Sequence, residues 1–188
     1  MNEYFIRLSK FLAYLLRHAP DKFNLKLDSN GFANLEDVIN ILKNRFNDNN
    51  ISIELLTKII ENSDKKRFCI INNKIKALYG HSLKQKIVIP EAEILPNRLY
   101  HGTTSKAFNK IKKEGLKRKN RQYVHLSDNP EIAFQTGLRR TVKPIILVID
   151  AFRAKNEGIK FYKSGDMYLA DYIPPKFISI YKKRNLNT

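Results

Sequence analysis

Cysteine and tryptophan are nearly absent from this sequence of 188 residues, which contains only Cys69 and no tryptophan. One cysteine excludes an internal disulfide and a cysteine-paired zinc site, so we expect a protein of a reducing, intracellular compartment. Long apolar runs are also missing, because no segment approaches the roughly 20 residues needed to span a bilayer. Arg7 and Lys10 interrupt the apolar N-terminal segment, unlike the core of a signal peptide. We therefore expect a soluble, cytoplasmic protein that does not act on a membrane.

Several site motifs are missing as well. The sequence contains no glycine-rich phosphate loop, no Gly-x-Gly-x-x-Gly fingerprint and no His-Glu-x-x-His motif. These absences argue against the common nucleotide-binding folds and zinc proteases. We expect no metal site.

Acidic residues are scarce relative to basic ones, with 18 Asp and Glu against 35 Lys and Arg and a net charge of +17. This charge exceeds what solubility requires, and both halves of the chain are basic. A nucleic acid partner would explain it, because each phosphate that Lys or Arg neutralises releases counterions. A lysine-rich proteome is the alternative explanation.

The first 90 residues combine helical periodicity with a strand pair. Apolar residues recur every three or four positions from Tyr4 to Leu16, and Ala19-Pro20 should end this helix. Asn34 and Ser52 are suitable N-caps for two further helices, the first of which is predicted to bury Leu35, Val38, Ile41 and Leu42. RFCIINNKIKALYG then alternates like two strands around an Asn72-Asn73 turn. Three helices and a hairpin predict a winged helix.

The remaining residues predict a second domain of short strands and helices. Two prolines between Leu83 and Asn97 mark a boundary, which gives domains 1–90 and 91–188. Helices are predicted from Ser105 to Gly115 and from Asn129-Pro130 to about Gly137. The predicted strands are LYHGT, YVHLS, PIILVID, IKFYK, MYLADYI and FISIYK. The whole chain is predicted to be α+β, with a mixed or antiparallel sheet in this second domain.

Four short patterns contain residues that could carry chemistry. They are Arg17-His18, the basic cluster Asp64-Lys65-Lys66-Arg67-Phe68, the strand ends His101-Gly102-Thr103 and His125-Leu126-Ser127, and Arg139-Arg140. Each has an ordinary structural explanation: cations compensate a helix dipole, a basic loop is solvated, and a buried histidine is often structural. Guanidinium groups could instead clamp a phosphate, and Gly102 could let a ligand approach the backbone.

In combination, these motifs resemble the RNA 2′-phosphotransferases that act in tRNA splicing, together with their bacterial and archaeal relatives. LSKFLAYLLRHAP, LDSNGFANLEDVI, DKKRFCI, ALYGHS and LYHGTTSKAFNKIKKEGL occur in the family's order, followed by RQYVHLS, TGLRR, PIILVID and ADYIPPKFI. The resemblance covers nearly the whole chain. It implies an N-terminal winged-helix lobe that binds RNA and a C-terminal lobe similar to ADP-ribosyltransferase folds.

The resemblance also implies the reaction. In the family, an internal RNA 2′-phosphate attacks C1″ of the NAD ribose and expels nicotinamide, which leaves an ADP-ribosylated phosphate. O2″ then attacks phosphorus, so that the products are 2′-OH RNA, ADP-ribose 1″,2″-cyclic phosphate and nicotinamide. NAD is thus consumed as a co-substrate. The expected partner is RNA with an internal 2′-phosphate, of which tRNA is one candidate, and we expect a monomer.

The family's residues can be carried over by motif. Its catalytic set corresponds to Arg17, His18, Arg67 and Arg139, and its cofactor-binding set corresponds to His101, Gly102, Thr103, His125 and Ser127. Arg139-Arg140-Thr141 stands where the family has Arg-His-Gly, so the choice between Arg139 and Arg140 stays open. His18 could hold the phosphate or donate a proton to the 2′-oxygen. Two other functions are considered: an ADP-ribosyltransferase that modifies nucleic-acid phosphate ends, and a non-catalytic nucleic-acid-binding module.

Overall fold

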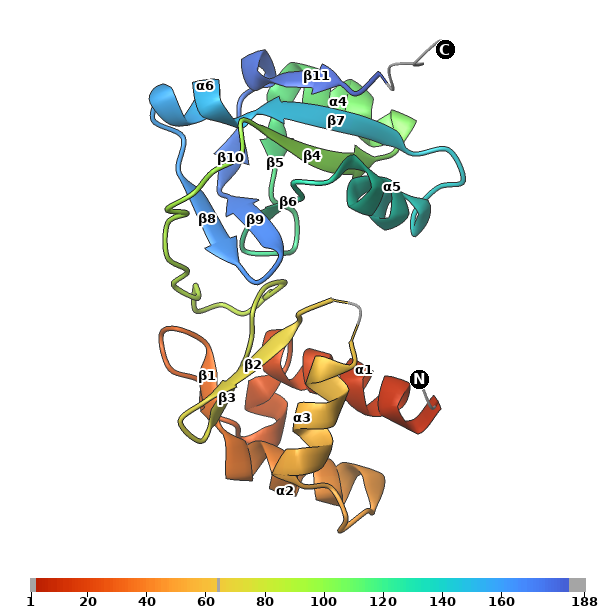
Figure 1. The fold of residues 1–188 in the computed structure, drawn as a ribbon, viewed down its shortest axis with the longest axis vertical. Helices are drawn as coiled ribbons and strands as arrows, with labels where there is room; N and C mark the ends of the chain where they lie inside the picture. Colours follow the sequence, from red (N-terminus) through yellow and green to blue (C-terminus); the bar gives the residue numbers. More distant parts are fainter. Residues whose placement is uncertain (1–2, 64, 183–188) are drawn as a thin grey trace. The chain divides into compact units, whose positions relative to one another are not determined.

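The chain folds into two units in the computed structural model, which describes residues 3–63 and 65–182 (Figure 1). One unit comprises residues 1–89 together with 120–122, and the other comprises 90–119 and 123–188. We call them unit 1 and unit 2. The described residues contain six α-helices and four small sheets, in which every strand pair is antiparallel. Asp64, in the predicted basic cluster, lies outside the described residues.

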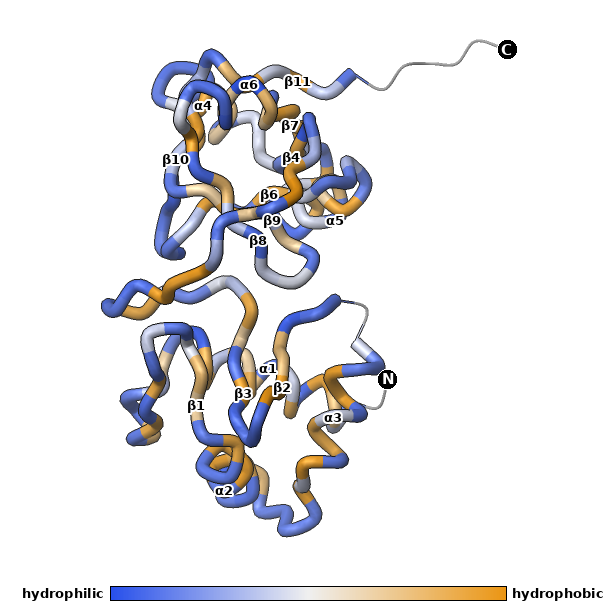
Figure 2. The backbone as a smooth tube through the Cα atoms, turned by 60° about the vertical axis from the view of Figure 1, so that its left-hand side comes forward, coloured by the Kyte–Doolittle hydropathy of each residue, from blue (hydrophilic) through white to orange (hydrophobic). Residues whose placement is uncertain are grey.

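Unit 1 contains the three predicted helices, which are α1 (Glu3–Arg17), α2 (Leu35–Phe46) and α3 (Ile53–Glu61). The side chain of Asn34 accepts hydrogen bonds from two backbone N–H groups of α2, and Ser52 accepts one from α3, as predicted for the caps. Leu35, Val38 and Leu42 are buried as predicted, and Ile41 packs against the core while partly exposed. Ile39, which was not predicted, is also buried. Hydrophobic colour recurs along α3 in Figure 2, and Leu56 and Ile59 of this helix are buried in the core.

A three-stranded sheet completes unit 1. Strands β2 (Phe68–Ile71) and β3 (Lys74–Ala77) form the predicted hairpin, and both turn residues, Asn72 and Asn73, have positive φ. Asparagine tolerates this left-handed conformation better than most residues, so it suits a two-residue turn. Strand β1 (Phe32–Asn34) was not predicted and pairs with β3 to give the order β1-β3-β2.

Unit 2 is built on a three-stranded sheet with the order β11-β7-β4. Its strands are β4 (Arg98–Thr103), β7 (Ile145–Asp150) and β11 (Ile178–Ile180). A second sheet has the order β6-β9-β8, with β6 (Val124–Leu126), β8 (Phe161–Ser164) and β9 (Met167–Ala170). Short strands β5 (Leu116–Lys117) and β10 (Tyr172–Ile173) pair with each other.

Helix α5 (Pro130–Leu138) packs very closely on β4. A Cβ atom at Gly102 would lie only 2.0 Å from the backbone oxygen of Ala133 and 3.1 Å from the backbone nitrogen of Gly137. Two glycines thus allow the strand and the helix to touch backbone to backbone. The remaining helices of unit 2 are α4 (Ser105–Glu114), which was predicted, and α6 (Ala151–Asn156), which was not.

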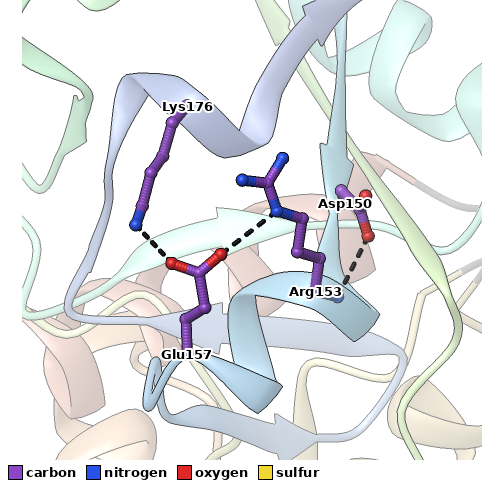
Figure 3. A network of polar contacts seen from close by, with 4 residues as sticks. All are labelled: Asp150, Arg153, Glu157 and Lys176. Carbon is purple, nitrogen blue, oxygen red and sulfur yellow. Dashed lines mark hydrogen bonds and ion pairs between the residues drawn. The ribbon is translucent and has the colours of Figure 1, made fainter.

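Polar contacts hold α6 at both ends (Figure 3). The side chain of Asp150 accepts a hydrogen bond of 3.0 Å from the backbone N–H of Arg153 and so caps the helix. Nε of Arg153 donates to Glu157 over 3.1 Å, and Lys176 forms an ion pair with the same carboxylate. Lys176 belongs to the 3-10 turn Pro175–Phe177, so the network joins this turn to α6.

No α-helix in the described part of the chain combines the length and the apolar character needed to cross a membrane.

Candidate active site

Arg17, the last residue of α1, is partly buried and lies near two aromatic rings. Its guanidinium carbon lies 5.6 Å from the ring centre of Phe68 and 5.1 Å from that of Tyr79, and Nη2 donates to the backbone oxygen of Arg67 over 3.4 Å. Gly80, with φ of +93°, leaves room for it, since a Cβ there would be 3.4 Å from Nη1. The aromatic faces fix the guanidinium through cation–π contacts.

Burial lowers the pKa of Arg17 to about 10, with the nearby charges of Arg121 and Arg67 adding to the effect and Tyr79 opposing it. Arg17 therefore stays protonated at neutral pH. Its Nε is buried and has no hydrogen-bond partner among the described residues. Such a donor is costly unless something satisfies it.

His18 is exposed and is oriented by Ser82. Its Nδ1 and the Ser82 hydroxyl share a hydrogen bond of 2.8 Å, and the backbone N–H of Ser82 donates to the carbonyl of Arg17 over 3.0 Å. The pKa of His18 is lowered, first by partial desolvation of the ring and then by Arg17 and Arg121. A bound anion would counteract these cations and favour the protonated imidazole.

Arg67 lies directly before β2 and is half-buried. Its backbone oxygen accepts from both Arg17 and the backbone N–H of Leu78, so the start of the hairpin is tied to the end of α1. Unit 1 therefore brings together the three predicted residues Arg17, His18 and Arg67. Arg121 and Arg67 lower the pKa of Arg17, and Arg17 and Arg121 lower the pKa of His18, whereas Tyr79 raises the pKa of Arg17.

The two histidine strand ends of unit 2 also meet. Backbone hydrogen bonds of 2.7 and 3.0 Å join Tyr100 and Ser127, which places the end of β6 beside β4. Nδ1 of His101 donates to the carbonyl of His125 over 2.9 Å, and Nδ1 of His125 donates to the carbonyl of Tyr123 over 3.1 Å. In the neutral form of each ring, Nε2 is then the acceptor nitrogen.

Three of the predicted cofactor-binding residues are buried or packed closely against α5. The hydroxyl of Ser127 accepts from the backbone N–H of Asn129 at the start of α5, and Ser127 is buried. Thr103 is also buried. The side of Gly102 that lacks a Cβ faces α5, so the structure explains this glycine by packing of a helix, whereas the sequence suggested approach of a ligand.

Arg139 and Arg140 are both exposed at the end of α5. Arg139 is the C-cap residue, and the backbone N–H of Arg140 donates to the carbonyl of Gly137 over 2.9 Å. Arg139 caps the C-terminal end of α5, and α5 packs on β4, the strand that contains His101. Within the described ranges, no cluster of three or more His, Cys, Asp or Glu residues could hold a metal ion.

Sequence reasoning gave no role to Tyr79, His81, Ser82, Arg121 or Gln122, although the structure places them around the end of α1 or the segment that follows β3. Gln122 is buried, and its backbone N–H donates to the carbonyl of His81 over 2.9 Å. Two of the matched motifs, ALYGHS and RQYVHLS, contain all five residues. The signal was therefore present, but no local pattern indicated that the two motifs meet.

Comparison with known proteins defines the class to which these features belong. A model of the family described as RNA 2′-phosphotransferase, Tpt1 / KptA family, matches residues 4–170. A probable RNA 2′-phosphotransferase of Acetivibrio thermocellus is 46% identical, covering 92% of this chain and 94% of the relative. One of Bacillus thuringiensis subsp. konkukian is 42% identical, covering 96% and 98%. Another, of Archaeoglobus fulgidus, is 37% identical, covering 93% and 79%.

These matches define an enzyme of the transferase class. The chain belongs to the RNA 2′-phosphotransferase family, Tpt1 / KptA.

Proposed function

We propose that this protein removes an internal 2′-phosphate from RNA by transferring it to NAD, with unit 1 holding the RNA phosphate and unit 2 holding NAD. The observation that carries the proposal is the group of Arg17, His18 and Arg67 in a chain of this family. Cations near a buried Nε that has no hydrogen-bond partner among the described residues are unfavourable in the protein alone. A bound phosphate would offset that cost.

Unit 1 is proposed to be a winged helix. Its elements follow the order α1-β1-α2-α3-β2-β3, and the β2–β3 hairpin would be the wing. Arg67 stands at the entry of this hairpin, and Arg17 ends the first helix. This topology supports an RNA-binding role, in agreement with the basic composition of the chain.

Unit 2 is proposed to be an ADP-ribosyltransferase-like lobe. Its small antiparallel sheets support this assignment, together with the meeting of β4 and β6 at Tyr100 and Ser127. The hydrogen-bonding groups also fit NAD, because the Nε2 atoms of two oriented imidazoles can accept hydrogen bonds from ribose hydroxyls. His101, Gly102, Thr103, His125 and Ser127 would line this site.

NAD would supply a ribose that accepts the phosphate and a nicotinamide leaving group. The chain's residues are then required to hold and neutralise the RNA phosphate. A 2′-phosphate is already an anionic nucleophile, so it requires alignment more than deprotonation. Arg17 and Arg67 supply guanidinium groups that can grip its oxygens, and Arg139 would do so as transfer proceeds.

His18 is proposed to contact the same phosphate. Its hydrogen bond to Ser82 orients the ring, and its lowered pKa leaves it largely neutral at pH 7 without substrate. Phosphate binding would raise this pKa, so the imidazolium could donate a proton to the departing 2′-oxygen.

The test is product analysis by mass spectrometry, using the full chain, NAD and a synthetic oligonucleotide with one internal 2′-phosphate. We expect 2′-OH RNA, nicotinamide and ADP-ribose 1″,2″-cyclic phosphate. A stable ADP-ribosyl adduct would indicate an ADP-ribosyltransferase instead. Binding without any change of the RNA would indicate a non-catalytic module.

A further inference from the structure

A groove in unit 2 lies between helix α4 and strand β11, whereas the predicted cofactor-binding residues belong to β4, β6 and the residue after β6 (Figure 1). Its volume is about 320 Å³, near the lower end of the range for small-ligand sites. The lining is mostly apolar, and the residues that form it are Phe108, Lys112, Pro175, Ile178, Ser179 and Ile180. We call this hollow the α4 groove.

Strand β11 brings unused backbone groups to the α4 groove. It is the outer strand of its sheet and pairs with β7. The backbone N–H of Tyr181 donates to the carbonyl of Ile146 in β7 over 2.8 Å. Because successive residues of a strand direct their backbone groups to opposite edges, those of Ile180 point away from β7. A ligand in the groove therefore lies beside a backbone donor and acceptor that β7 does not use.

Helix α4 is fixed at both ends. At its start, the side chain of Thr104 accepts a hydrogen bond of 3.2 Å from the backbone N–H of Ala107. At its end, the hydroxyl of Tyr172 donates to the carbonyl of Glu114 over 2.9 Å. A helix held in this way presents its side chains to a ligand at a smaller entropic cost.

The segment that contains α4 is strongly basic. Residues 105–119 include seven Lys and Arg and one acidic residue, Glu114. This carboxylate lies 3.9 Å from Nζ of Lys110 and 3.1 Å from that of Lys117. Lys112 and Lys113 are exposed and form no ion pair in the described part of the chain. Because neighbouring like charges on a helix repel one another, a polyanion would stabilise this segment.

This chemistry favours single-stranded RNA over a protein as the occupant of the groove. Lysine is depleted in protein–protein interfaces, whereas a lysine that neutralises a phosphate releases counterions and gains affinity. Sites for single-stranded nucleic acid combine a basic surface with aromatic rings on which bases stack. Phe108 and Lys112 supply these two parts four residues apart, on adjacent turns of α4.

We propose that the α4 groove binds an unpaired nucleotide of the RNA other than the phosphorylated one, with its base against Phe108 and a backbone phosphate on Lys112. This inference rests on the proposed function, because the RNA is the same substrate. The groove adds affinity for the single-stranded flank of that substrate. It does not contact the phosphate that is transferred.

The test compares short and long oligonucleotides, each with and without one internal 2′-phosphate, using the full chain without NAD. The long strands carry single-stranded flanks of about 10 nucleotides, a length typical of single-strand sites. Fluorescence anisotropy gives the ratio of the two affinities, which we call the flank advantage. We expect Phe108→Leu to lower the flank advantage about tenfold, as loss of one stacked base commonly does. Phe108→Tyr should keep it.

Lys112→Gln provides a second readout at an exposed position. The logarithm of affinity for the long strand should depend less steeply on the logarithm of salt concentration, with a slope smaller by about 0.7 for one lost phosphate contact. Its slope for the short strand should not change. The matched control is Lys155→Gln, an exposed lysine of α6 in the same unit, which should keep both slopes and the flank advantage. Circular dichroism verifies that each variant is folded.

The outcomes separate this inference from the proposed function. A flank advantage that is absent from the unmodified chain, or that both Phe108→Leu and Lys112→Gln retain, overturns the role of the groove. A chain that does not prefer the 2′-phosphate overturns the proposed function, while the unphosphorylated strands still test the groove. Self-association in analytical ultracentrifugation that Ile180→Lys abolishes would make the groove an interface between two copies, and would also overturn its role in RNA binding.

Discussion

The side chain of His81 is 3% exposed, and its Nε2 has no hydrogen-bond partner in the described part of the chain. Burial lowers its pKa to about 4, with smaller contributions from Arg17, His18 and Lys76. The unfolded chain should titrate near the ordinary value of about 6.5. Between these two values the unfolded state binds a proton that the folded state does not bind.

The free energy of unfolding should therefore fall as the pH drops from 6.5 toward 4. Above pH 6.5, His81 should make no pH-dependent contribution to it. One titrating group changes the free energy of unfolding by about 1.4 kcal/mol per pH unit inside that window, or about 2 kcal/mol between pH 6.5 and 5. His81→Leu should flatten the dependence in this range. Urea unfolding at several pH values measures it, and an equal slope in both proteins would show that His81 is not the group responsible.

Arg139 and Arg140 differ in the chemistry that we expect of them, although both are exposed at the end of α5. Arg139→Ala should lower the single-turnover rate by about 10²-fold, as loss of a donor that stabilises developing charge commonly does. Arg140→Ala should stay near the normal rate. The reverse result would move the catalytic assignment to Arg140.

Arg67→Ala tests which step depends on a guanidinium. The second step concentrates negative charge around phosphorus, whereas the first mainly requires alignment. We therefore expect this variant to accumulate RNA that carries ADP-ribose on its 2′-phosphate. Rapid-quench sampling followed by mass analysis would detect it. Slow turnover without this species would place the effect of Arg67 on the first step or on binding.

At the level of helices and strands, the longer elements could be predicted because their periodicity and caps are local. Helices α1 to α5 and the β2–β3 hairpin follow from apolar spacing, from caps such as Asn34 and Asn129, and from the Asn72-Asn73 turn. Strands β1 and β5 have three and two residues, which is too short for a period to appear. MYLADYI, predicted as one strand, is divided at Asp171 into β9 and β10.

Helix α6 shows why some elements could not be predicted from local sequence patterns. It has six residues, and its network includes Lys176, which is 19 residues from Glu157 in the sequence. A tertiary partner at that separation leaves no periodic signal. The candidate site has the same limitation: Arg17, His18 and Arg67 could be assigned from their motifs, but the side-chain hydrogen bonds of Gln122 join residues 35 to 39 positions apart.

The contact between α5 and β4 gives a prediction for Gly102→Ala. The added methyl group would lie 2.0 Å from the backbone oxygen of Ala133, so the helix would have to move. Overpacking of this kind typically costs about 1–3 kcal/mol. Urea unfolding measures the loss, and Thr136→Ala on an exposed position of α5 is the control, which should change stability by about 0.5 kcal/mol or less. Equal stabilities for both variants would contradict the close packing.

For the whole molecule, the net charge of +17 predicts a strong effect of salt on RNA binding. Each phosphate contacted by a basic side chain releases counterions, so the logarithm of the binding constant should fall linearly with the logarithm of salt concentration. A protein that makes six or more phosphate contacts should lose about 10³-fold in affinity or more between 50 and 200 mM salt. Titrations at four salt concentrations measure the slope, and a flat line would refute the electrostatic account.

The insertion of residues 120–122 into unit 1 has a consequence for how the protein is made. During synthesis, residues 1–89 leave the ribosome first, but the four hydrogen bonds of Gln122 to the segment 81–87 cannot form until some thirty further residues have been added. At about 5–20 residues per second, this delay is on the order of seconds. Unit 1 thus remains without these four hydrogen bonds while the beginning of unit 2 is already being translated.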